Sequence, residues 1–452
     1  MKEIQLTIES FSKKGFGVGF SPTGKRIEVS DAIIGDEVMV ELKSRRKRGR
    51  VLSVVSPSKD RCTPKCQHAT MCGGCTWQVM DYKSQLEQKE AIIQRSFSDL
   101  PTDFYPIIPC EFPWQYRNKM EFSFSENAAG AKYLGLMIAG AAPYVFNVEL
   151  CHLAKPWFSE TLSRVRTWWE NSDLKAYHMH KNLGHLRTLI LREGINTGEK
   201  LAMLTISGDT ILDESTLNSF IEAIGPDIQI FIRTQNAQKG TPTTFTTTCL
   251  TDREYILEKL QVLGDELFFK VSPTSFFQPN THQAEIIYNK ALSLLEEESS
   301  LIFDLYSGTG TLGMLASKKA KKVIGIELNA DAVKDALQNT ELNKITNFEI
   351  IEGDVGKVIT HLMSQEDFVR PDAVIVDPPR AGLDPLALHH LKTLLPKKIV
   401  YISCNPYTQA ENITELKKAG YQLKLIQPID QFPHTHHIEN IALLSLPTEN
   451  DS

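Results

Sequence analysis

The C-terminal part of the chain, from about residue 278, alternates short runs of β-branched and aliphatic residues with longer amphipathic stretches. Such alternation predicts a parallel β-sheet whose strands are joined by helical crossovers. In an open sheet of this kind, ligands bind beyond the carboxyl ends of the strands. We therefore predict an α/β fold for this region, with its functional site where the strands end.

Each predicted strand of this region ends in a polar or reactive group. The five segments are SLIFDLYSGTG, KKVIGIELN, FEIIEGD, PDAVIVDPPR and KIVYISCNP, and they end in a glycine loop, Glu327, Asp354, Asp377 and Cys404. A single acid after a strand can serve as a helix cap. Five polar ends in succession indicate a binding site instead.

The glycine loop allows two interpretations. Gly308, Gly310 and Gly313 match the dinucleotide fingerprint G-x-G-x-x-G, and Glu327 follows at a distance suited to binding ribose hydroxyls. A nicotinamide-dependent dehydrogenase is therefore one candidate. The full loop, DLYSGTGTLG, places Asp304 inside the end of the strand and is similar to the loop of class I S-adenosylmethionine methyltransferases. This resemblance favours a methyltransferase domain with a Rossmann-like fold.

The motif DPPR narrows the chemistry. Methyltransferases that act on exocyclic amines resemble this motif but carry an aromatic residue after the prolines, where this chain has Arg380. Asp377 can hydrogen-bond the edge of a base, and the two prolines stiffen the loop. The motif therefore favours a ring carbon over an amine as the methylated atom.

Cys404 suggests how a ring carbon could be methylated. Carbon 5 of uracil is a poor nucleophile, but addition of a thiolate to carbon 6 makes it one by covalent catalysis. A base must later remove the carbon 5 proton. Glu439, in FPHTHHIENIALL before the final apolar strand, is the candidate base. A lone cysteine can also be a small buried apolar residue.

Three histidines in the same segment have no assigned role. They are His434, His436 and His437. A metal cluster is one alternative, although the loop offers no cysteine or acid at ligand spacing. We interpret them as polar loop residues near the base or the RNA.

A cysteine-rich loop follows the N-terminal region. The segment CTPKCQHATMCGGC contains Cys62, Cys66, Cys72 and Cys75. No secretory signal precedes it, so its thiols are better interpreted as metal ligands than as disulfides. Four thiolates can bind either zinc or an iron–sulfur cluster, and spacing alone does not separate the two.

The first 57 residues form short alternating runs with glycine-containing turns, which predict a small β-barrel. The basic run KSRRKRGR, residues 43–50, is either a solvated hairpin turn or a nucleic-acid patch. The chain is 42% hydrophobic and 23% charged, and no apolar stretch is long enough to span a membrane. We therefore expect a cytoplasmic protein without membrane contact.

Together the motifs SCNP, HIEN, DPPR, DLYSGTG and SFFQPN resemble the RNA uracil-5-methyltransferases, which form 5-methyluridine in transfer and 23S ribosomal RNA. The resemblance implies Cys404 as nucleophile and Glu439 as base. It also implies a pocket for S-adenosylmethionine and the base, lined by Gln278, Tyr306, Gly308, Thr311, Glu327, Asp354 and Asp377. Family members often have Phe-Cys-Gly-x-Gly-Asn-Phe where this chain has YSGTGTL, so Thr311 departs from the pattern.

The resemblance also interprets the cysteines and the domains. The 23S ribosomal RNA members hold a [4Fe-4S] cluster, whose ligands would here be Cys66, Cys72, Cys75 and Cys151, with Cys62 as an additional thiol. The N-terminal region resembles a TRAM domain, an OB-like RNA-binding barrel. Three domains follow: residues 1–57 as the TRAM-like barrel, 58–271 as a central β-rich iron–sulfur domain and 272–452 as the methyltransferase domain.

The predicted function is methylation of carbon 5 of a uridine in 23S ribosomal RNA, with no obligate protein partner and a monomeric state. The target must be single-stranded or flipped, because a thiol cannot reach carbon 6 inside a duplex. The same chemistry on transfer RNA and an RNA-binding protein without activity are the alternatives. RNA cytosine-5-methyltransferases use similar covalent chemistry but resemble one another in having two cysteines, one of them in the loop that here contains Asp377. This chain has no cysteine in that loop.

Overall fold

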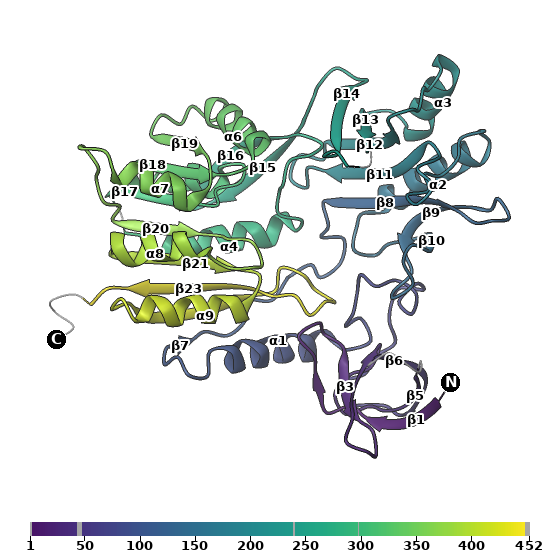
Figure 1. Ribbon diagram of the computed structural model, residues 1–452, viewed down its shortest axis with the longest axis horizontal. Coiled ribbons are helices and arrows are strands. Elements are labelled where there is room, and N and C mark those ends of the chain that lie inside the picture. The colour runs from purple at the N-terminus through teal and green to yellow at the C-terminus, as the bar shows by residue number, and fades with distance from the viewer. Residues whose placement is uncertain (1, 43–47, 238–239, 297, 448–452) are drawn as a thin grey trace.

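The computed structural model describes residues 2–42, 48–237, 240–296 and 298–447. Its strands form three main sheets and one separate hairpin (Figure 1). Most of the basic run predicted at 43–50 lies outside the described residues, and only Arg48, Gly49 and Arg50 belong to a described strand.

The N-terminal sheet has six strands in the order β1-β5-β6-β4-β3-β2 and curls upon itself (Figure 1). Its strands are β1 (Lys2–Thr7), β2 (Ser10–Phe11), β3 (Gly17–Phe20), β4 (Arg26–Ser30), β5 (Glu37–Leu42) and β6 (Arg48–Ser56). Alternate residues such as Val38 and Val40 are fully buried inside it. The predicted β-rich N-terminal region is confirmed.

The central sheet has seven strands in the order β10-β9-β8-β11-β12-β13-β14. They are β8 (Lys119–Glu126), β9 (Lys132–Met137), β10 (Val145–Asn147), β11 (Leu186–Glu193), β12 (Lys200–Ser207), β13 (Ile228–Asn236) and β14 (Thr244–Cys249). Helices α2 (Pro156–Glu170) and α3 (Glu214–Ile224) share an apolar core with this sheet. Ile190, Met203 and Phe231 instead join the core of the C-terminal region.

The C-terminal sheet has eight strands in the order β19-β18-β17-β20-β21-β23-β22-β7. They are β17 (Ser299–Leu305), β18 (Ala320–Glu327), β19 (Phe348–Glu352), β20 (Ala373–Val376), β21 (Lys398–Ser403), β22 (Gln422–Ile429), β23 (Glu439–Ser445) and β7 (Asp103–Phe104). The five strands from β19 to β21 are parallel, as predicted, and β23 is antiparallel to β21. The predicted α/β, Rossmann-like architecture is confirmed.

Six helices and one hairpin accompany this sheet. The helices are α4 (Thr281–Ser293), α5 (Thr311–Ala316), α6 (Ala330–Leu342), α7 (Val355–Met363), α8 (Pro385–Leu394) and α9 (Pro406–Lys417), and the hairpin joins β15 (Ile256–Val262) to β16 (Asp265–Val271). Gly310 and Asn405 precede α5 and α9, so each helix starts at the carboxyl edge of the sheet, where its N-terminal amides can address a ligand.

A segment from the first quarter of the chain completes the C-terminal sheet. Helix α1 (Tyr82–Ser96) packs against α9, and Ile93 and Phe97 enter the same core as the strands of the sheet. Strand β7 then pairs in parallel with Leu425 and Ile426 of β22. The outer edge of the sheet is therefore covered by residues that lie more than three hundred positions earlier in the sequence.

None of the helices in the described ranges is long and apolar enough to cross a membrane.

An ion pair connects the N-terminal sheet to Arg61, the residue that precedes the cysteine loop. Arg61 donates to both carboxylate oxygens of Asp36, with an Nη2–Oδ2 distance of 2.9 Å, and also to the carbonyl of Asp31. The Asp36 side chain is fully buried and also accepts the amides of Ile33 and Ser58. A buried carboxylate of this kind depends on its counter-charge.

We expect Arg61→Leu to destabilise the N-terminal sheet by about 3 kcal/mol, because Asp36 would remain buried without its counter-charge. Adding Asp36→Asn should recover much of this loss, since the amide keeps an oxygen for Ser58 and removes the charge. Hydrogen exchange of the amides of Val38 and Val40 in urea measures both effects. Equal protection in all three proteins would contradict the assigned role of the pair.

Candidate active site

The register between two strands brings the predicted nucleophile and base together. Strands β21 and β23 are antiparallel, with Ser403 opposite Asn440. The next position of this register places Cys404 across from Glu439. Cys404 is half-buried at the end of β21, and Glu439 is buried at the start of β23. The two predicted residues therefore lie together at the carboxyl edge of the sheet.

The charges around Cys404 act in opposite directions. Burial raises the pKa of its thiol to about 11, and the neighbouring Glu439 and Asp377 contribute to the increase. The Arg380 guanidinium, which is hydrogen-bonded to the thiol, opposes it. The backbone of Arg380 is fixed by Asn405, whose side-chain amide donates to the Arg380 carbonyl at 2.8 Å. Arg380 is thus the group that favours the thiolate.

Three carboxyl groups crowd this edge of the sheet. Burial, with Asp304 as neighbour, raises the pKa of Asp377 to about 7, and burial also raises that of Asp304 to about 7. Glu439 has its pKa raised well above the ordinary value, by burial first and by Asp377 second. Buried carboxyl groups with raised pKa values are typical of catalytic sites and of sites that bind cationic ligands.

The glycine loop is shaped by Glu327. One oxygen of its carboxylate accepts the amide of Gly308 at 2.9 Å, and the other accepts the amide of Asn329. Gly308 has a φ of +57°, and a Cβ atom built on it would meet no other atom within 4 Å. The space above Gly308 is therefore open, next to a carboxylate that has further lone pairs to offer.

Two more predicted pocket residues, Thr311 and Asp354, make structural contacts at the start of α5 and α7. Thr311 is buried as the first residue of α5, and its hydroxyl lies 3.3 Å from that of Thr309. The carboxylate of Asp354 accepts the amide of Lys357 and caps α7, so the helix-cap alternative holds for one of its oxygens.

The side chain of Tyr306 is directed away from the glycine loop. Its hydroxyl donates to Asp384, the residue that caps α8, at 2.8 Å, and its ring packs beside the core of the sheet. Tyr306 has a φ of +61°. It can therefore serve a cofactor through its backbone rather than through its hydroxyl.

Gln278 connects three parts of the chain. Its carbonyl accepts from Asn118, and its side-chain oxygen lies 3.4 Å from the side-chain nitrogen of Gln431. Asn118 is almost fully buried and also reaches Thr281. Asn118 belongs to the segment QYRNKMEFSF, which resembles a family segment that meets RNA, and here it supports Gln278. Gln431 is a support of the site that the motifs did not identify, since its partners are distant in sequence.

The three histidines of the segment before Glu439 have different neighbours. His434 stacks on Trp114 with ring centroids 3.7 Å apart, His436 lies near Thr76, and His437 lies 3.4 Å from the Arg380 guanidinium. Burial lowers the pKa of each, to about 4 for His434 and His436 and to about 3 for His437. They are therefore neutral at pH 7. The rings of His436 and His437 lie together, with centroids 4.1 Å apart, whereas His434 lies apart from them against Trp114.

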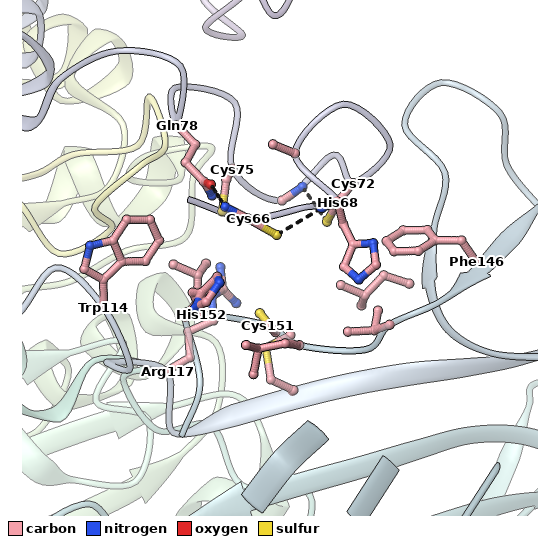
Figure 2. Close-up of a pocket in the computed structure, with 17 residues that line it drawn as sticks. Cys66, His68, Cys72, Cys75, Gln78, Trp114, Arg117, Phe146, Cys151 and His152 are labelled. Carbon is pink, nitrogen blue, oxygen red and sulfur yellow. Dashed lines mark hydrogen bonds between the residues drawn. The ribbon is translucent and has the colours of Figure 1, made fainter. Parts of the chain in front are cut away.

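A second candidate site is a cavity of about 150 Å³ lined by four cysteines (Figure 2). Cys66, Cys72 and Cys75 come from the cysteine loop, and Cys151 approaches from the segment before α2. Cys62 does not line the cavity, and its thiol donates to the carbonyl of Gln78. The structure thus brings together the four cysteines predicted as ligands and leaves the additional thiol outside.

Neighbouring thiols contribute to raised pKa values at three cysteines of the cavity, Cys72, Cys75 and Cys151. Burial and the neighbouring Cys151 and Cys72 raise the pKa of Cys75 to about 12, and Arg117 opposes this increase. In the part of the chain that the structure describes, no three His, Cys, Asp or Glu side chains form a group that could hold a single metal ion. The cavity therefore joins four thiols without gathering them as closely as one ion requires.

The remaining cysteines have local partners. Cys110 is buried beside Asn280, and the thiol of Cys249 donates to the carbonyls of Thr251 and Arg253. Both have local contacts typical of a structural cysteine.

Comparison with known proteins agrees with this geometry. A family model described as tRNA (Uracil-5-)-methyltransferase matches residues 243–446. An uncharacterized RNA methyltransferase of Protochlamydia amoebophila is 45% identical over 93% of this chain and 100% of its own length. Another from Clostridium acetobutylicum is 34% identical over 97% of each chain.

One solved structure is similar over nearly the whole chain. The Pyrococcus abyssi tRNA (uracil-54, C5)-methyltransferase, in complex with S-adenosyl-L-homocysteine, superimposes with a TM-score of 0.76. Its sequence is 27% identical, and the match covers 98% of this chain and 100% of that one.

The fold and the groups at the strand ends define an S-adenosylmethionine-dependent RNA methyltransferase. More narrowly, the chain belongs to the RNA uracil-5-methyltransferase family.

The opposing charges beside Cys404 predict opposite effects of two substitutions. Arg380→Met should raise the pH at which Cys404 reacts with iodoacetamide by about one unit, because a cation that favours the thiolate is lost. Glu439→Gln should lower it, because a neighbouring negative charge is removed. Mass spectrometry of the peptide that contains Cys404 follows the reaction across pH. If neither substitution changes the pH profile, neither charge affects the pKa of the Cys404 thiol.

Proposed function

We propose that this protein methylates carbon 5 of a uridine in 23S ribosomal RNA, with Cys404 as nucleophile and Glu439 as base. The proposal rests on one observation above all, the register that places a thiol opposite a carboxyl group at the carboxyl edge of a Rossmann-like sheet. The two groups approach from neighbouring strands. A planar base inserted between them would be within reach of both.

The residues present fit S-adenosylmethionine. The space above Gly308 is open, and Glu327 beside it can accept hydrogen bonds from ribose hydroxyls. Asp304 and Asp377 have raised pKa values because they are buried and unneutralised, and a ligand that carries positive charge would stabilise their ionised forms. Gln278, Tyr306, Thr311 and Asp354 complete the proposed pocket. The sulfonium group supplies the methyl group.

The chemistry of the protein residues follows in three steps. The thiolate of Cys404, favoured by Arg380, adds to carbon 6 of uracil and forms a C–S bond, which leaves an enolate. Carbon 5 then carries the nucleophilic electron pair and becomes methylated. Glu439 removes the remaining proton from carbon 5, the double bond re-forms, and the C–S bond breaks to release Cys404 as a thiolate.

The raised pKa of Glu439 bears on its role. A carboxyl group in this environment is a stronger base than an ordinary glutamate once it is ionised. The positive charge of the bound cofactor and of Arg380 favours its ionised form. The fraction of enzyme with a competent base therefore rises with pH, so the release step should accelerate from acidic toward neutral pH.

We further propose that Cys66, Cys72, Cys75 and Cys151 hold a [4Fe-4S] cluster. Four thiols line one cavity, which matches the number that such a cluster requires. Iron bonded to all four would favour their thiolate forms, including those of Cys72, Cys75 and Cys151, whose pKa values the cavity otherwise raises. When bound, the cluster supplies cross-links between the cysteine loop and the central sheet. It would act structurally, because methyl transfer to an activated uracil requires no electrons.

The choice of RNA has two candidates. The N-terminal sheet, which we interpret as a TRAM-like barrel, and the cysteine cavity favour 23S ribosomal RNA through the family resemblance. A transfer RNA remains the second candidate, because the Pyrococcus abyssi enzyme, named for a tRNA uridine, matches 98% of this chain. Trapping the RNA on the enzyme therefore distinguishes the two substrates.

Trapping with 5-fluorouridine tests the proposed reaction. Fluorine cannot leave as a proton, so a methylated adduct should stall on the enzyme and migrate slowly on a denaturing gel. We expect this band with wild type and 23S ribosomal RNA, and none with Cys404→Ala. A band formed only with transfer RNA would select the second substrate. No band with either RNA, in protein that binds S-adenosylmethionine, would refute the covalent mechanism.

Metal analysis tests the cluster. Protein purified without oxygen should contain about four iron and four sulfide per chain. Cys151→Ser should lose most of this iron, whereas Cys62→Ser should retain it, because the Cys62 thiol lies outside the cavity. Zinc in place of iron, or equal losses in both variants, would contradict the proposed ligand set.

A further inference from the structure

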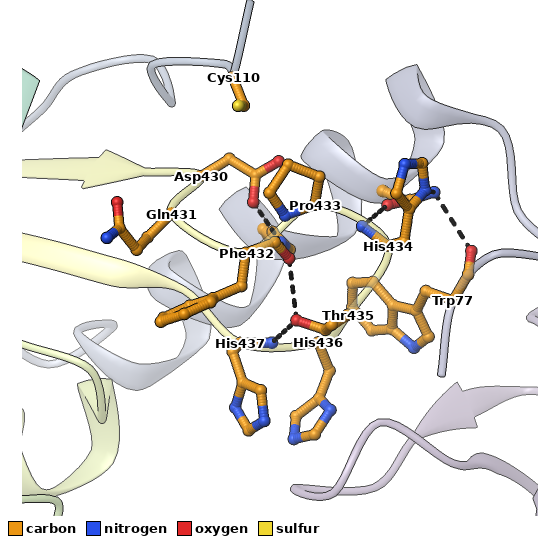
Figure 3. Close-up of polar contacts among 12 residues, drawn as sticks. Trp77, Cys110, Asp430, Gln431, Phe432, Pro433, His434, Thr435, His436 and His437 are labelled. Atoms are coloured by element: carbon orange, nitrogen blue, oxygen red, sulfur yellow. Dashed lines mark hydrogen bonds and ion pairs between the residues drawn. The ribbon is translucent and has the colours of Figure 1, made fainter. Parts of the chain in front are cut away.

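The connection between β22 and β23, residues 430–438, leads directly to Glu439 and is here called the base loop. Ile429 and Glu439 pair at its two ends, so the loop is closed at its base by the ladder. Most of its residues are buried, although polar side chains predominate. Buried loops are uncommon, because their polar groups need partners inside the protein. Figure 3 shows the side chains of the base loop together with Trp77.

Helix α1 supplies the first set of partners. Lys89 forms an ion pair with Asp430, and both side chains are fully inaccessible to solvent. The Lys89 ammonium also donates to the carbonyl of Phe432 at 3.0 Å. The Tyr82 hydroxyl donates to the second oxygen of Asp430 at 2.7 Å. The start of the loop is therefore fixed to α1 by charge and by hydrogen bonds.

Gln85, one turn away on the same helix, fixes the middle of the loop. Its side-chain oxygen accepts the amide of His434 at 2.8 Å, and its nitrogen donates to the carbonyls of Trp77 and Met80. The amide of Trp77 donates in turn to the carbonyl of His434 at 3.0 Å. Gln85 thus joins the segment between the cysteine loop and α1 to the base loop, and both backbone groups of His434 are satisfied.

His434 needs this support. Its φ of +65° lies in the left-handed region, which costs free energy for a residue other than glycine. Stacking on Trp114 and the two backbone hydrogen bonds hold it there. Removal of Gln85 would take one of these constraints away, and the chain could relax toward an ordinary conformation.

The carboxyl group of Glu439 has no support of its own. Within the described part of the chain, no hydrogen bond reaches it, and its neighbours act on it only by charge. The direction of its side chain is therefore set by the backbone where the base loop enters β23. Cys404, by contrast, directly follows β21, and Asn405 beside it donates to the Arg380 carbonyl, a contact that lies outside the base loop. The base loop reaches this side of the site through His437, which lies 3.4 Å from the Arg380 guanidinium.

We propose that Gln85 and Lys89 are positioning residues for Glu439, acting through the base loop on the removal of the carbon 5 proton. The assignment rests on the proposed function of Cys404 and Glu439. Neither Gln85 nor Lys89 is exposed to solvent, so neither contacts RNA. Their loss should slow the second half of the reaction, proton removal and release of the RNA, and leave thiol addition and methyl transfer in place.

The test compares Gln85→Leu with wild type. The substrate is the 23S ribosomal RNA transcript that wild type methylates, made with ordinary uridine, and the methyl donor is radioactive S-adenosylmethionine. A displacement of a reacting group by about 1 Å can cost on the order of 100-fold in rate. We expect turnover to fall by about that factor. Methyl transfer in the first turnover should stay within about threefold, and methylated protein–RNA adduct should accumulate without fluorouridine. The weaker variant Tyr82→Phe should show a smaller accumulation.

Two reference variants separate the possible outcomes. Tyr421→Phe removes a buried hydrogen bond to the carbonyl of Pro396, outside the base loop, and should accumulate no adduct. Glu439→Gln should accumulate adduct strongly. Adduct with Glu439→Gln but not with Gln85→Leu, or an equal loss of both half-reactions in Gln85→Leu, would overturn the positioning role alone. No adduct with Glu439→Gln would overturn the proposed mechanism, and this assignment with it.

Discussion

The antiparallel pairing of β21 with β23 is the constraint on which the site depends. In a purely parallel sheet, each strand delivers its last residue to the carboxyl edge, and its first residue lies at the opposite edge. Because β23 runs the other way, it brings its first residue, Glu439, to the edge where β21 delivers Cys404. Two groups with different chemical properties thereby face one another across a single strand spacing.

The protein holds its thiols in two electrostatic settings. At the sheet edge, one thiol lies between a guanidinium that favours ionisation and carboxyl groups that oppose it, so small changes in neighbouring charge change its state. In the cavity, burial and neighbouring thiols raise the pKa values of Cys72, Cys75 and Cys151, and a cationic partner would favour their thiolates. The first setting suits a nucleophile that must attack and leave, and the second suits permanent ligation.

The sequence predicts the parts of the fold that local pattern determines. Alternation of strand and helix predicted the parallel sheet, and the polar residue at each strand end predicted which side carries the site. The motifs could not predict that the Tyr306 hydroxyl is directed to Asp384, because side-chain direction depends on packing against α8. Nor could they predict that α1 and β7 complete the C-terminal sheet, since those contacts join residues hundreds of positions apart. Gln85 belongs to no motif, and only its tertiary partners reveal its role.

The coverage of the sheet edge by β7 bears on how the chain folds during synthesis. Because synthesis runs from the N-terminal end, β7 and α1 are made more than three hundred residues before their partners β22 and the base loop. Until then, Ile93 and Phe97 lack their partners in the sheet, and Lys89 lacks Asp430. Contacts between residues so distant in sequence form slowly, and apolar surface stays exposed until they form. A nascent chain of this protein therefore leaves part of the apolar surface of α1 uncovered until β22 has been made.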